Sequence, residues 1–502
     1  MHKIKTTALV ALLVVGLAIT VIPAVTASDG WTLVAERGVK AYPDLMETVW
    51  QKVPIALPNG PYDKIGLHRL VKTGIEPRGV LFILPGTWSS GEQMTSNPPE
   101  DAWTKYENYT QSIYWANRGF DVYAIDYRTH FVPNTLTPAQ LSFMVNWGWD
   151  QWISDIKEAV DMAKEVSGAK RIYMAGESFG GGAAMNYASK YWEEDLKGII
   201  LLDGGPGGKR GGETNTYNLT AMINLMIATG KWSSEVGAPA VGAVFLYKYA
   251  LANPGAPAEY PPENKLLPLN NPRTGQPWTN ITEYCAYSLY MSWGPGGVTN
   301  IYGGYGKPSV MIEIMSTFDR YWPARLTLES TAISNWVNCP YVTYDFDDHY
   351  SEIDVPLLGF TSGLFGLPYM GPFIHGIANP DFTGIYLLGY GHLDVYSGEY
   401  SMSDVSAPTY QWMISHRMLV GFGGIRVDRK WNWGKTTIYI NLTVIDFKVD
   451  GVRVAWNIID HRIYKNLESY KGEGELGSIA ILIYKQYAAA TGPKAFFFGQ
   501  RV

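Results

Sequence analysis

The sequence has few charged residues and few cysteines. Only 17% of its 502 residues are charged, and 46% are hydrophobic, which fits a globular protein and argues against long disordered regions. The formal net charge is -6 and no basic stripe is present, so nucleic acid is not an expected partner.

The sequence also lacks the patterns that hold common cofactors. His, Cys and carboxylate residues do not cluster at metal-ligand spacing, and neither a Rossmann fingerprint nor a P-loop is present. We therefore expect no metal and no other cofactor. The sequence has two cysteines, Cys285 and Cys339, which suits an exported protein. They would either form a disulfide or remain two buried free thiols.

The first 27 residues are typical of an export signal peptide. A short basic region, with Lys3 and Lys5, precedes an uncharged apolar stretch at 7–25, and small residues at 25–27 provide a cleavage pattern. An uncleaved membrane anchor is the alternative, because about 19 apolar residues almost span a bilayer. In either case we expect the rest of the chain to lie outside the cytoplasm, and to be secreted if the signal is cleaved.

Short apolar runs alternate with helical patterns between about residues 79 and 204. Apolar residues recur every three or four positions at 149–163, which predicts a helix, and a second helix starts at 181. The runs have the length and composition of strands buried on both faces, and they lie at 80–84, 122–125, 171–175, 198–202, 355–360 and 384–388. This alternation predicts a mostly parallel sheet with helices on both faces.

Two segments depart from this pattern. Residues 205–352 are rich in Pro, Gly, Trp and Tyr but hold helix-like pieces, so we interpret them as a helical insertion. After residue 420, alternating apolar residues and an Asp450-Gly451 turn predict a small antiparallel β module. The predicted organisation is a signal peptide (1–27), an α/β core in two parts (28–204 and 353–420), the insertion (205–352) and the β module (421–502).

The central motif is Gly176-Glu177-Ser178-Phe179-Gly180, a G-x-S-x-G pattern between a predicted strand and a predicted helix. In that context the serine occupies a sharp turn that exposes its hydroxyl, and the glycines allow strand and helix to pass closely. A serine hydroxyl needs an adjacent base to act as a nucleophile. We therefore predict Ser178 to be a nucleophile; a glycine-rich phosphate-binding or packing turn is the alternative.

His392 is the predicted general base. It follows the predicted strand at 384–388 through Gly389-Tyr390-Gly391, and it lies C-terminal to the serine. We expect solvated or structural roles for four other histidines, which are His349, His375, His416 and His461.

These motifs resemble the α/β-hydrolase superfamily over roughly residues 65–420. The resemblance rests on the serine motif with Gly181, on Pro85-Gly86-Thr87 after a strand, and on Gly391-His392-Leu393-Asp394. It implies an α/β-hydrolase fold in which the insertion forms a cap or lid. It further implies an oxyanion hole made by the backbone N–H groups of Thr87 and Phe179, with Trp88 as a nearby alternative to Thr87.

The resemblance also implies a catalytic triad of serine, histidine and an acid. The acid departs from the usual pattern. The family usually places an Asp after the strand at 355–360, but residues 361–366 contain no carboxylate. Some members carry the acid after the preceding strand, which here points to Asp203, and Asp381 is the alternative. We expect structural roles for Asp126, Arg128 and Asp394.

Together these features predict a secreted serine hydrolase that forms an acyl-enzyme. The aromatic insertion favours a small-molecule ester with an apolar or aromatic group. A serine peptidase or amidase, or an acyltransferase, is the alternative on the same fold. A different class of protein is the second alternative: a non-catalytic protein that binds a cell surface through its β module. The enzyme could also associate with a cell surface through the same module.

Overall fold

The computed structural model describes more than half of the chain. The described residues are 30–39, 42–56, 60–95, 110–206, 218–235, 243–257, 276–285, 308–334, 339–362, 382–387 and 390–415, together with the strand segments 430–433, 436–439, 445–449 and 452–459. The predicted signal peptide lies outside them. Within these ranges, no helix is both long and apolar enough to cross a membrane.

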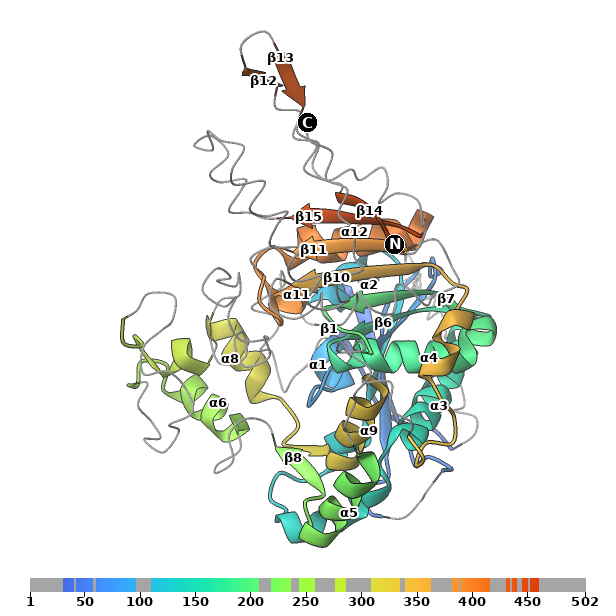
Figure 1. Cartoon of the computed structure of the whole chain (residues 1–502), viewed down its shortest axis with the longest axis vertical. Coiled ribbons are helices and arrows are strands. Elements are labelled where there is room, and N and C mark those ends of the chain that lie inside the picture. The colour runs from blue at the N-terminus through green and yellow to red at the C-terminus, as the bar shows by residue number, and fades with distance from the viewer. Residues whose placement is uncertain are drawn as a thin grey trace, which may run out of the picture.

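An 11-stranded sheet forms the centre of the described structure (Figure 1). Its order is β1-β2-β3-β5-β4-β6-β7-β10-β11-β15-β14. Neighbours are parallel from β5 through to β15, and antiparallel among β1, β2, β3 and β5 and between β15 and β14. The strands are β1 (Thr32–Val39), β2 (Tyr42–Lys52), β3 (Ile65–Lys72), β4 (Val80–Leu84), β5 (Asp121–Asp126), β6 (Ile172–Glu177), β7 (Leu196–Leu202), β10 (Leu357–Ser362), β11 (Phe382–Leu387), β14 (Ile445–Val449) and β15 (Val452–Ile459).

Helices cover both faces of this sheet. Alternate residues of a strand point to opposite faces, and on β4 Phe82 and Leu84 enter one hydrophobic core while Leu81 and Ile83 enter another. The first core contains residues of α3 and α4, and the second contains residues of α2 and α12. The predicted fold class is thus confirmed. The helices of the core are α1 (Gly91–Thr95), α2 (Gln111–Asn117), η2 (Arg128–Phe131), η3 (Pro138–Asn146), α3 (Trp149–Ser167), α4 (Phe179–Asp195), α11 (Asp394–Ser397), η5 (Met402–Ser406) and α12 (Ala407–Ser415).

The described parts of segment 205–352 are mainly helical. Figure 1 shows α6 beside α8 at one side of the sheet, and α5 near α9 at its lower end. Glu329 of α9 accepts a hydrogen bond from the backbone N–H of Trp149 at 2.7 Å, which joins the segment to the start of α3. The elements are α5 (Leu219–Thr229), β8 (Ser233–Glu235), α6 (Ala243–Ala252), α8 (Pro308–Ser316), β9 (Tyr321–Pro323), α9 (Ala324–Ser334) and η4 (Asp347–Glu352).

The C-terminal segment contributes strands to the main sheet. β14 and β15 pair antiparallel, with Val449 opposite Val452; the predicted Asp450-Gly451 turn between them lies outside the described residues. β15 also pairs in parallel with β11, so that the two strands continue the core sheet rather than standing apart from it. A second antiparallel pair, β12 (Lys430–Trp433) with β13 (Thr436–Tyr439), forms its own two-stranded sheet.

Candidate active site

Ser178 lies in a strained turn between β6 and α4. Its backbone has φ 54° and ψ −118°, a conformation that non-glycine residues rarely adopt. The turn is tight enough that a Cβ on Gly176 would lie 2.1 Å from the carbonyl oxygen of Gly180. A Cβ on Gly180 would in turn lie 2.0 Å from the Leu84 carbonyl oxygen. The glycines of the motif are therefore required for the strand and helix to approach.

A chain of hydrogen bonds connects Ser178, His392 and Asp203. Asp203 Oδ2 lies 2.7 Å from His392 Nδ1, and His392 Nε2 lies 2.8 Å from Ser178 Oγ. An ionised carboxylate only accepts hydrogen bonds, so Nδ1 carries the ring proton and Nε2 is left to accept from the serine. The structure thus brings together the predicted nucleophile, base and acid in the tautomer that general-base chemistry requires.

Asp203 reaches this chain from the end of β7. Its φ of 51° is positive, and its side chain is fully buried. The backbone N–H of Ser362 donates to Oδ1 at 2.6 Å and the Ser362 hydroxyl to Oδ2 at 2.7 Å. Ser362 ends β10, the strand after which the usual acid was missing from the sequence. Because β7 and β10 are paired neighbours, a carboxylate on one reaches the end of the other.

The loop that carries His392 is held by a second carboxylate. Asp394 Oδ2 accepts a hydrogen bond from the backbone N–H of Gly391 at 2.6 Å, which agrees with its predicted structural role. Burial opposes the charged form of His392, but the hydrogen bond to Asp203 and the charges of Asp203 and Glu177 outweigh it. The net effect is a raised pKa for His392.

The residues predicted for the oxyanion hole lie beside Ser178. Thr87 lines a pocket at the serine together with Trp88, Ser89, Phe318 and Leu393. Phe179 is the first residue of α4, where backbone N–H groups have no acceptor within the helix.

The loop that carries Thr87 is anchored on two sides. The Tyr127 hydroxyl donates to the Pro85 carbonyl at 3.1 Å. The backbone N–H of Asp319, in segment 205–352, donates to the Trp88 carbonyl at 2.7 Å, and Trp88 itself has a φ of 64°. The segment predicted as a cap therefore contacts the loop directly, and its Phe318 lines the pocket.

Glu177 is part of the site, although no role was predicted for it. Its side chain is buried, and Oε1 lies 3.7 Å from His392 Nε2. Burial, with a smaller contribution from the charge of Asp203, raises the pKa of Glu177 to about 7, against the opposing charge of His392. Its position directly before the serine was the only available signal, because that position in the motif accepts many residue types.

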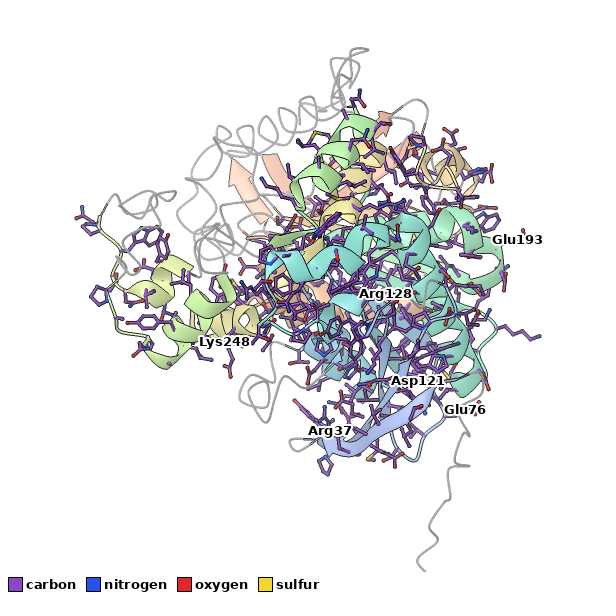
Figure 2. The ribbon with its side chains drawn as sticks, turned by 90° about the horizontal axis from the view of Figure 1, so that it is seen from below. Arg37, Glu76, Asp121, Arg128, Glu193 and Lys248 are labelled. Atoms are coloured by element: carbon purple, nitrogen blue, oxygen red, sulfur yellow. The ribbon has the colours of Figure 1, made fainter. Side chains whose placement is uncertain are left out.

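The remaining predicted residues do not face the serine. Asp126 accepts from His68 Nε2 at 2.8 Å, and Arg128 is fully buried against Asp63 and Asp155 at 2.6 Å each. In Figure 2, Arg128 lies well inside the molecule, whereas Arg37 lies at its rim.

His349 bonds Glu352 at 2.9 Å and is partly exposed. Cys285 and Cys339 are separate buried thiols. The alternative acid Asp381 and the histidines His375, His416 and His461 lie outside the described residues.

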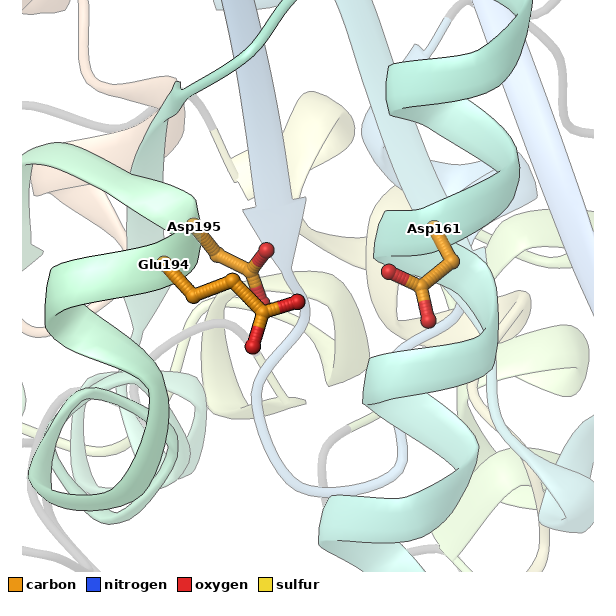
Figure 3. A group of neighbouring side chains, drawn as sticks. All are labelled: Asp161, Glu194 and Asp195. Carbon is orange, nitrogen blue, oxygen red and sulfur yellow. The ribbon is translucent and has the colours of Figure 1, made fainter.

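Three carboxylates near the end of α4 are spaced closely enough to hold a cation. Asp161 of α3 faces Glu194 and Asp195 at the end of α4 (Figure 3). Lys157 contacts all three carboxylates, at 2.6, 3.1 and 3.2 Å, and Lys164 also contacts Asp195. Two lysines therefore balance most of this charge, and the group offers no argument for a metal.

Comparisons with known proteins identify the family of the chain. A family model described as serine aminopeptidase, S33, matches residues 103–207, which include the serine motif. No curated protein matches the chain. Among solved structures, the chain is similar to a candidate lipase from Sulfolobus solfataricus, with 36% identity and a TM-score of 0.59. That match covers 78% of this chain and 100% of the other.

Two other solved structures are more distant. One is a Paleococcus ferrophilus monoacylglycerol lipase, with 12% identity, a TM-score of 0.39 and coverage of 70% of this chain and 99% of the other. The other is the epoxide hydrolase CorEH, with 13% identity, a TM-score of 0.37 and coverage of 74% and 99%. The fold, the serine turn and the Sulfolobus match define a hydrolase. The chain belongs to the α/β-hydrolase superfamily.

Proposed function

We propose that this protein is a serine hydrolase that cleaves a carboxylic ester through Ser178, His392 and Asp203. The observation that carries the proposal is the hydrogen-bond chain from Ser178 Oγ through the His392 ring to Asp203, with links of 2.8 and 2.7 Å. Such a chain is the arrangement that lets a serine hydroxyl act as a nucleophile at neutral pH.

In the proposed reaction, Ser178 Oγ bonds to the ester carbonyl carbon while its proton moves to His392 Nε2. The N–H groups of Thr87 and Phe179 bind the oxygen that becomes negative. The carbon–oxygen bond to the alcohol then breaks, and the proton on Nε2 passes to the leaving oxygen. A water molecule, deprotonated by the same nitrogen, then bonds to the acyl carbon. The bond from that carbon to Ser178 Oγ breaks, the proton on Nε2 returns to Oγ, and the acid leaves.

The substrate is proposed to carry an apolar or aromatic group. The pocket beside Ser178 has aromatic and aliphatic walls from Trp88, Phe318 and Leu393, and such surfaces gain from burying apolar groups. The description of the Sulfolobus solfataricus structure as a candidate lipase also supports ester substrates. Export through the N-terminal signal belongs to the same proposal, as does association with a cell surface through the C-terminal strands.

A second candidate is hydrolysis of an amide or peptide. It is supported by the family model that matches residues 103–207, whose description is a serine aminopeptidase. Ester and amide substrates would use the same serine, so a substrate panel has to separate them. Acyl transfer to an alcohol would appear as ester exchange when a second alcohol is added.

The first test is labelling with a fluorophosphonate probe, which reacts with activated serines. We expect the wild-type protein to be labelled and Ser178→Ala to remain unlabelled. Ser189→Ala is the matched control, because Ser189 lies on the same helix and its hydroxyl donates to the Asn186 carbonyl rather than to His392. A wild-type protein that is folded but not labelled would favour the non-catalytic binding protein. Nitrophenyl esters of varied acyl length and aminoacyl nitroanilides then separate esterase from peptidase activity.

A further inference from the structure

Glu177 contacts two parts of the proposed site at once. It is the last residue of β6, and its side chain is only 3% exposed. The carboxylate of Glu177 interacts with the backbone N–H of Gly86, the residue before Thr87, and Oε2 is its oxygen nearest to Gly86. The approach is so close that a Cβ on Gly86 would lie 2.2 Å from Oε2.

The other oxygen of Glu177 faces the histidine. Oε1 lies 3.7 Å from His392 Nε2, the atom that receives the Ser178 proton in the proposed reaction. Within the described residues, Oε1 accepts no hydrogen bond although it is buried. A buried carboxylate oxygen without a partner is costly and calls for an explanation in a native structure. A role limited to holding Gly86 would explain Oε2 and leave Oε1 unexplained.

We propose that Glu177 is a positioning residue of this site: its carboxylate stabilises the protonated His392 ring from the Nε2 side and holds the Gly86 amide, and with it the loop that carries Thr87. This inference rests on the proposed serine hydrolase function. Glu177 takes no proton in the reaction. The Ser178 proton moves to Nε2 and from there to the leaving oxygen, while the Glu177 charge favours the intermediate state in which the ring is positive.

Other ionisable groups lie around this pair. Asp203 binds the opposite ring nitrogen of His392, and Asp394 lies next to it on the same loop. The hydroxyls of Tyr127 and Tyr396 are buried near Glu177, and its negative charge contributes to their raised pKa values after burial itself. The His392 ring is thus held between two carboxylates, Asp203 on Nδ1 and Glu177 near Nε2.

Removing the charge of Glu177 should change how kcat/KM depends on pH. The charge of His392 opposes the effect of burial on Glu177, and the charge of Glu177 raises the pKa of His392, so each group favours the charged form of the other. Glu177→Gln removes this mutual effect and should lower the pKa of His392. Because the base must be neutral to accept a proton, the acid limb of kcat/KM should move to lower pH, by about one pH unit. The same loss of stabilisation should lower kcat at the plateau by about tenfold, with KM little changed.

The test compares Glu177→Gln with wild type and with Glu92→Gln on one nitrophenyl ester from pH 5 to 9. Glu92 is the matched control: it follows the same loop, and burial raises its pKa too, but its carboxylate faces His130 instead of His392. We expect both the limb shift and the kcat loss in Glu177→Gln alone. An unshifted limb, equal effects in both variants, or a loss confined to KM would overturn the inference.

Two further measurements keep the result interpretable. Glu177→Asp retains the charge but withdraws it from Nε2. The acid limb of Glu177→Asp should therefore lie between those of wild type and Glu177→Gln. If the Gln variant does not fold, an unshifted limb in the Asp variant overturns the inference.

NMR titration of His392 reports its pKa without turnover. If wild type is labelled by fluorophosphonate and the His392 pKa is unchanged in Glu177→Gln, only this inference fails. An unlabelled, folded wild type overturns the proposed function itself.

Discussion

Replacing Asp203 with asparagine tests the least expected member of the site. Asp203 now accepts from Ser362 and from His392 Nδ1, at distances of 2.6 to 2.7 Å. In Asp203→Asn the amide oxygen can still accept from the Ser362 backbone, which leaves the amide NH₂ group facing the histidine. His392 must then accept at Nδ1 and carry its proton on Nε2, where it cannot receive the proton of Ser178. The fold should be retained, because the same groups remain hydrogen-bonded.

The expected loss follows from the wrong tautomer. In a serine hydrolase with this arrangement, such a change lowers kcat by about 10⁴-fold, or about 5 kcal/mol of barrier. The assay is kcat on a nitrophenyl ester, with the rate of fluorophosphonate labelling and the melting temperature measured alongside.

The matched control for this prediction is Asp404→Asn. It also replaces a buried carboxylate near this loop, which accepts from the Tyr390 hydroxyl at 2.6 Å. We expect at most about a tenfold effect there, since the group does not bind the histidine. If Asp203→Asn keeps kcat within about tenfold of wild type, Asp203 is not the acid of the triad, and Asp381→Asn becomes the next variant to measure.

Three further outcomes are expected. Gly86→Ala would place its new methyl group 2.2 Å from Glu177 Oε2, so either the loop or the Glu177 side chain must move, and both belong to the site; steady-state kinetics should show kcat reduced by about 100-fold, and an unchanged kcat would contradict this. Arg128→Met would leave two buried aspartates unpaired and should lower the free energy of unfolding in urea by about 3–5 kcal/mol; a loss below about 1 kcal/mol would count against it. Burial opposes the charged form of His68, but the nearby carboxylate of Asp126 helps to raise the pKa of His68 to about 9. Its contribution to stability is therefore complete below pH 6.5 and lost as the pH rises through 9, a dependence that should flatten in His68→Gln.

The buried strands and the serine turn could be predicted from the sequence, because each depends on residues that are close along the chain. The apolar run at 80–84 coincides with β4, and the helical pattern at 149–163 falls within α3. The motif around Ser178 is likewise local, since its glycines, strand and helix are contiguous.

Features that depend on distant pairing were not predictable in this way. The strands β1, β2 and β3 contain charged residues, so they do not form the apolar runs that mark a buried strand. A hydrophobic pattern also cannot show that buried Glu47 on β2 pairs with buried His68 on β3. The support of Asp203 by Ser362 depends on β7 and β10 being neighbours, which the sequence does not state. The orientation of Glu177 toward His392 has the same origin, because the two residues meet only in the folded sheet.

The pairing of β15 with β11 affects how far this chain could be shortened. β11 leads into the loop that carries His392, and with β15 beside it β11 is an interior strand. A chain ended near residue 420 would leave the N–H and C=O groups of β11 open along one side. Such an open edge pairs readily with other chains. We therefore expect a chain shortened before β14 and β15 to self-associate and lose solubility, even where every residue of the proposed active site is kept.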